Sequence, residues 1–183
     1  MKVAKIAKIA LCVVMALAFS MGTPAYAVTA ADIDAGVKIS LDKLEKIDGG
    51  DTVINGAKGM LVFPSVFKAA IGFGGEYGEG ALIEAGQTDG YYSTAAASFG
   101  LQLGGQKKTI IIAFMTDDAL NNFKKSEGWK IGADASVAVI AIGAGTQISS
   151  AISNKPIVAF VFDEKGLMYD LSINGAKVTK ITR

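Results

Sequence analysis

The chain has 183 residues and a net charge of +1, from 18 Lys and Arg against 17 Asp and Glu. This balance argues against a nucleic-acid partner, because neutralising phosphates requires a clear excess of basic residues. With no histidine and one cysteine, Ser-His-Asp and Cys-His catalytic groups and the usual zinc sites cannot be assembled. We therefore expect a protein that is not an enzyme and has no cofactor.

The first 27 residues have the three parts of a secretory signal peptide. Lys2, Lys5 and Lys8 form a basic start, residues 9–19 form an apolar run that includes the cysteine, and Ala25-Tyr26-Ala27 supplies a small-x-small cleavage pattern. The alternative is an uncleaved membrane anchor, but the run is shorter than the roughly 20 residues that span a bilayer. We expect an exported, mature single domain over residues 28–183 with a net charge of −2, because the three lysines leave with the signal.

The mature chain is expected to begin with a helix that covers a sheet. Thr29-Ala-Ala-Asp32 resembles a capping box, and apolar residues then recur at helical spacing, at Ile33, Val37, Leu41 and Leu44. These features predict an amphipathic helix over residues 30–47. A short helix over 51–58 and a buried strand, GMLVFP, follow, and we expect this strand to end at Pro64 because proline lacks a backbone donor.

Two strands with a face of small residues are expected next, over 70–83 and 91–105, as a hairpin joined by the polar turn EAGQTDG. Successive strand residues point to opposite sides. In the first strand, Glu76 is the one long side chain among the bare even positions, and in the second strand the even positions 94, 96, 98, 100 and 104 are small. The glycines of this face are Gly72, Gly74, Gly78, Gly80, Gly100 and Gly104. Such a face allows close approach by another part of the fold or by an acyl chain, and both explanations stay open.

The rest of the chain predicts strands and one short helix. The helix covers 116–124, with acids in its first turn and lysines in its last. The expected strands are TIIIAFM at 109–115, KIGADASVAVIAIGAG at 130–145 with helix as the alternative, PIVAFVF at 156–162, LMYDLSI at 167–173 and AKVTKI at 176–181, with turns at DEKG and Asn174-Gly175. Together the patterns predict an α+β fold: a mostly antiparallel sheet or partial β-barrel with a long N-terminal helix and one or two short helices.

Two groups of residues are candidates for function. Glu76 and Glu79 lie three apart on a predicted strand, so they face opposite sides and do not form a glycosidase pair. A second group combines lysines at or near predicted strand ends with aromatic residues, as an anionic lipid surface requires. Its members are Lys58, Lys68, Lys107, Lys108, Phe63, Phe67 and Phe73. The alternative is that these lysines are scattered and solvated.

Three successive stretches resemble the signature blocks of the SYLF domain family. They are AKGMLVFPSVFKAAIGFGGEYGEGAL at 57–82, SFGLQLGGQ at 98–106 and KIGADASVAV at 130–139. The positions that match the family pattern are Lys58, Gly59, Phe63, Pro64, Lys68, Gly72, Gly75, Glu76, Tyr77, Gly78, Glu79, Gly80, Phe99, Gly100, Gly132, Ala133 and Asp134.

The resemblance implies a non-enzymatic domain that binds membrane lipids, with phosphoinositides as ligands of eukaryotic members and actin as a partner of some. Eukaryotic members add SH3 or FYVE modules, for which this chain has no room, so we do not expect actin regulation here. Resemblance and signal peptide together suggest a periplasmic or secreted bacterial protein that binds membrane lipid, with anionic phospholipid as the expected class. The alternative is a structural or protein-interaction module of the cell envelope without a lipid ligand.

Overall fold

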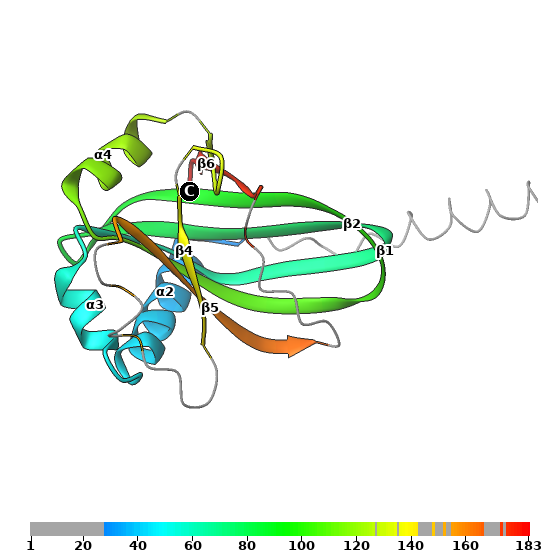
Figure 1. Ribbon diagram of the computed structural model, residues 1–183, viewed down its shortest axis with the longest axis horizontal. Helices are drawn as coiled ribbons and strands as arrows, with labels where there is room; N and C mark the ends of the chain where they lie inside the picture. Colours follow the sequence, from blue (N-terminus) through cyan, green and yellow to red (C-terminus); the bar gives the residue numbers. More distant parts are fainter. Residues whose placement is uncertain are drawn as a thin grey trace, which may run out of the picture.

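Two long antiparallel strands, β1 (Gly59–Glu84) and β2 (Gln87–Phe114), dominate the fold (Figure 1). The computed structural model describes residues 28–126, 128–134, 136–142, 148, 152, 155–166, 173 and 175–183, with the backbone alone at 70–73, 98–104 and 163–166. Ala85 and Gly86, both with positive φ, form the tight turn between the two strands. The hairpin prediction is confirmed, although the strands are longer and their turn is shorter than expected.

The sheet has the order β3 (Trp129–Lys130), β6 (Lys177–Ile181), β2, β5 (Ile157–Gly166) and β4 (Ala138–Ile142), with β1 also paired to β2. β6 pairs with the first half of β2 and β5 with its second half. Among the described residues, only the β4–β5 pairing is parallel. The sheet curls into a half-barrel, so the predicted α+β class with a mostly antiparallel sheet is confirmed.

β1 folds back on itself, and two glycines permit the contact between its halves. A Cβ atom at Gly78 would stand 2.8 Å from the carbonyl oxygen of Ser65, and one at Gly80 would overlap the carbonyl oxygen of Val62. Because all four residues belong to β1, the strand must reverse its course between them. Figure 1 shows β1 and β2 bending together at the end of the molecule that carries their labels. No side chain larger than hydrogen fits at this contact.

Two apolar cores lie on opposite faces of the sheet, because successive side chains of its central strands alternate. In β2, Ile110 and Ile112 enter the interior of the half-barrel, whereas Ile111 and Ala113 enter the second core. α4 (Asp117–Lys125) closes the first core with Leu120 and Phe123. α2 (Ala30–Glu45) and α3 (Gly50–Gly56) cover the second core.

The helices begin where the sequence predicts. The hydroxyl of Thr29 accepts from the Asp32 amide at 3.2 Å and the Asp32 carboxylate accepts from the Thr29 amide at 3.0 Å, which confirms the capping box of α2. Asp34, two residues further along α2, accepts hydrogen bonds from Thr88 and Tyr91 and so connects α2 to the start of β2. Among the described residues, no helix is both long and apolar enough to cross a bilayer.

Three expectations about the strands are wrong. Pro64 does not end its strand. It lies in a bulge of β1 between Phe63 and Val66, where the pairing with β2 shifts and the ladder requires no backbone N–H donor at this position. Residues 163–166 continue β5 instead of forming a turn. The stretch 130–145 is not one strand, because Gly132, with φ of 85°, separates β3 from β4. Residues 143–145, 167–172 and Asn174 lie outside the described residues.

We predict that Gly80→Ala destabilises the protein while Gly75→Ala does not. The new methyl group at Gly80 would overlap backbone of the facing half of β1, whereas at Gly75 it would meet its nearest atom at an ordinary 3.9 Å. Overpacking of this kind costs about 1 to 3 kcal/mol. Urea unfolding of both variants measures the difference. Equal stabilities would show that the two halves of β1 are not held at this distance.

Candidate functional site

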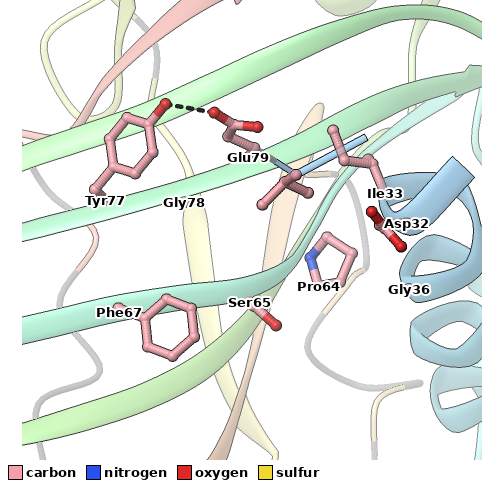
Figure 2. A pocket seen from close by; sticks show the side chains of 10 residues that line it. Asp32, Ile33, Gly36, Pro64, Ser65, Phe67, Tyr77, Gly78 and Glu79 are labelled. Atoms are coloured by element: carbon pink, nitrogen blue, oxygen red, sulfur yellow. Dashed lines mark hydrogen bonds between the residues drawn. The ribbon is translucent and has the colours of Figure 1, made fainter. Parts of the chain in front are cut away.

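An apolar groove lies between the start of α2 and the folded-back β1 (Figure 2). It has a volume of about 310 Å³. Its lining residues are Val28, Asp32, Ile33, Gly36, Pro64, Ser65, Phe67, Tyr77, Gly78 and Glu79. Residues 64–67 come from the first half of β1 and residues 77–79 from the second, so the groove exists only because the strand doubles back.

Exposed apolar side chains gather at this groove. Five large apolar residues are exposed in the described part of the chain, and Val28, Phe67 and Tyr77 among them line the groove. Phe67 is 61% exposed and Tyr77 is 51% exposed. The other two, Ile39 and Val139, do not line it. A concentration of aromatic surface beside a cavity is typical of a contact site for another apolar group.

The polar wall of the groove is formed by Glu79. Its carboxylate accepts a hydrogen bond of 2.7 Å from the Tyr77 hydroxyl (Figure 2) and also binds the guanidinium of Arg183, with Nε 3.0 Å from Oε2 and Nη2 against Oε1. The hydrogen bond to Glu79 raises the pKa of Tyr77 above its usual value. The two bonds together fix Glu79, and Tyr77 is held with its ring at the groove.

Of the lysines predicted to form a lipid-binding rim, Lys107 lies nearest to the groove. It pairs across the strands with Phe67, and its Nζ stands 6.0 Å from the centre of the Phe67 ring. Lys58 precedes β1 and is exposed, with Nζ 3.8 Å from a carboxylate oxygen of Asp117 in α4. The structure thus brings Lys107 and Phe67 together and places Lys58 elsewhere.

The other predicted rim residues do not share this surface. Lys68 and Lys108 are buried, and Phe63 belongs to the core of the half-barrel. Lys68 and Lys108 point inward because side chains alternate along a strand and their neighbours Phe67 and Lys107 face outward. Phe63 faces the interior because the bulge between Phe63 and Val66 shifts this alternation. The side chain of Phe73 lies outside the described residues.

A buried ion pair crosses the interior of the half-barrel. Lys108 is completely buried, and its Nζ lies 2.9 Å from Oε2 of Glu76. The two are not opposite each other in the β1–β2 register, where Glu76 faces Ala96 and Lys108 faces Val66. The pair therefore connects one half of the folded-back ribbon to the other. Oε1 of Glu76 and both amide atoms of Gln106, two residues before Lys108, are buried and have no hydrogen bond within the part of the chain that the structure describes.

The sequence contained a partial signal for these residues. Glu76 is the one long side chain among the glycines of the first predicted strand, which marks it as unusual, but nothing in the local pattern identifies Lys108 as its partner. The pairing of Glu79 with Arg183 spans 104 positions and has no local signal. Tyr77 is one of the positions that match the family pattern, but the sequence does not indicate that its side chain is exposed.

The half-barrel, its apolar groove and its exposed aromatic residues define a small binding domain. A family model described as Ysc84, Las17-binding protein actin regulator, matches residues 95–182. This match confirms the predicted resemblance to the SYLF domain family over that part of the chain. The match runs from β2 to just past β6, so it contains the second and third sequence blocks and leaves Phe67 and Tyr77 outside. No curated protein matches the chain.

We predict that Lys108→Met is strongly destabilising and that adding Glu76→Leu restores most of the loss. The single substitution removes the cation that lies 2.9 Å from the buried Glu76 carboxylate, and breaking a buried pair in this way typically costs about 3 to 5 kcal/mol, whereas replacing both partners with apolar residues is often close to neutral. Chemical unfolding of wild type, both single variants and the double variant gives the coupling energy. Additive effects would contradict a direct buried pair.

Proposed function

We propose that this protein is a non-enzymatic lipid-binding or membrane-associating domain of the bacterial envelope. The observation that carries the proposal is the groove beside β1, where Phe67 and Tyr77 stay exposed although apolar side chains of this size favour burial. Insertion of the two aromatic rings among lipid chains would remove this surface from water. Lys107 beside Phe67 would lie at the level of the headgroups, where a lysine is attracted to anionic phospholipid.

The match to the family model supports a binding role without defining the ligand. The description of the family names Las17 binding and actin regulation. This leaves a second candidate, a protein-interaction module of the envelope in which the same groove takes an apolar segment of another protein. We favour lipid because the exposed surface combines two aromatic rings with a neighbouring lysine, the composition of an interfacial membrane contact.

We predict that Phe67→Ser and Tyr77→Ser each weaken binding to vesicles of phosphatidylglycerol and phosphatidylethanolamine roughly tenfold. Burying an aromatic side chain contributes about 1.5 to 3 kcal/mol, and a tenfold change corresponds to about 1.4 kcal/mol. Co-sedimentation over a range of lipid concentrations measures the partition. The matched control is Ile39→Ser, which removes a similarly exposed apolar side chain from α2 outside the groove.

Ile39→Ser should bind as wild type does. If all three variants bind equally, the groove is not the membrane contact. If wild type binds no vesicles, the lipid proposal fails and the protein-interaction candidate replaces it.

We further propose that the protein is exported and that the mature chain begins at Val28, following cleavage after Ala25-Tyr26-Ala27. Val28 lines the groove, so cleavage there would place the new N-terminus at its wall. The intact mass of protein recovered from the extracytoplasmic fraction of its native host should correspond to residues 28–183. A mass that retains Cys12 would contradict cleavage.

A further inference from the structure

The charge of the groove depends on a residue that lies far from it in the sequence. Glu79 is the carboxylate of the polar wall, and only 10% of its side chain is exposed. Arg183 follows β6, which reaches β1 through β2: Glu79 pairs with Ser93, and Ser93 pairs with Thr179. The Arg183 guanidinium donates one hydrogen bond to each oxygen of the Glu79 carboxylate, which forms a bidentate fork. This geometry gives the strongest form of carboxylate–arginine contact.

The other charges around the groove do not replace Arg183. Asp32 is the second carboxylate of the lining, and it accepts its hydrogen bonds from Thr29, which brings no positive charge. Lys107 lies over the Phe67 ring, with its Nζ 6.0 Å from the ring centre, and is not one of the residues that line the groove. With Arg183 in place, the wall at Glu79 is close to neutral. Without it, Glu79 is uncompensated, and in a mature chain that begins at Val28 the groove holds two carboxylates against one terminal ammonium group.

We propose that Arg183 is a specificity-determining residue of the groove, which admits anionic lipid by cancelling the charge of Glu79. The inference rests on the proposed lipid-binding function. An uncompensated carboxylate in the wall would repel a phosphate headgroup at the groove mouth while leaving the contact between the aromatic rings and acyl chains intact. Loss of Arg183 should therefore change which headgroups are accepted more than it changes binding in general.

The test compares Arg183→Gln with Lys180→Gln in the mature protein, purified after export. Both remove one positive charge near the end of β6, but only Arg183 contacts Glu79. Binding to phosphatidylglycerol vesicles should fall roughly tenfold for Arg183→Gln, the order of effect of one unit charge about 10 Å away at an effective dielectric of about 20. Binding to phosphatidylcholine vesicles should change little. Lys180→Gln should show no such difference between the two vesicle types.

A double variant separates charge from structure. Glu79→Gln combined with Arg183→Gln has no fork but also no uncompensated carboxylate, so it should recover anionic binding to within about twofold of wild type. If the fork mattered only for holding the fold, the double variant would stay as weak as the single one. That result, or an equal loss on both vesicle types, would overturn the inference.

A readout without lipid keeps this inference distinguishable from the proposed function. The Tyr77 hydroxyl donates to Glu79, so the pKa of Tyr77, followed by NMR of ¹³C-labelled tyrosine, reports the local charge. Arg183→Gln should raise this pKa further, because the phenolate loses a neighbouring cation, while Lys180→Gln should leave it unchanged. If the pKa of Tyr77 is unchanged in Arg183→Gln, the inference is overturned. If the pKa of Tyr77 shifts in Arg183→Gln but the wild-type protein binds neither type of vesicle, the proposed lipid-binding function is contradicted. The inferred selectivity for anionic lipid is then contradicted as well.

Discussion

The close approach between the two halves of β1 is the constraint on which the other features of the molecule depend. Gly78 and Gly80 lie where a Cβ atom would meet the backbone of Ser65 and Val62, so the strand can double back only with hydrogen at these positions. Doubling back closes the half-barrel around its core, and it also brings residues 64–67 and 77–79 together as the walls of the groove. A strand that stayed straight would have neither the enclosed interior nor the groove.

The buried ion pair in the half-barrel constrains how the two halves of the β1–β2 hairpin pack on each other. Glu76 and Lys108 lie on different strands, are not register partners, and are both buried, so they meet only when the two halves of the ribbon are correctly placed. Buried ion pairs contribute little net stability because desolvation offsets the attraction, but a misplaced one is costly. A slip of one residue in β2 would turn Lys107 inward and Lys108 outward, which the interior would not tolerate. We interpret the pair as a determinant of register.

Local patterns in the sequence predicted the elements well and their long-range arrangement poorly. The capping box at Thr29, the helix after Thr116 and the small-residue hairpin follow from propensity and periodicity, and the structure confirms them. The continuation of β1 through Pro64 was not predictable, because the bulge depends on pairing with β2. The same is true of the site: Lys68 and Lys108 are chemically suited to a lipid surface, but which strand face they occupy is decided by the register. The partnership of Glu79 with Arg183 depends on the position of β6 beside β2, which only the tertiary structure shows.

Photo-crosslinking with a phospholipid that carries a photoreactive group on its acyl chain tests most directly whether the folded-back β1 creates the binding site. Irradiation of the protein on vesicles, followed by peptide mass spectrometry, identifies the residues in contact with the chain. If the groove is the site, labelling concentrates on residues 64–67 and 77–79, in both halves of β1, and falls in Gly80→Ala, where the new methyl group forces the halves apart. Labelling that is absent, or that falls on α4 or β4 and persists in Gly80→Ala, would contradict a lipid site at this groove.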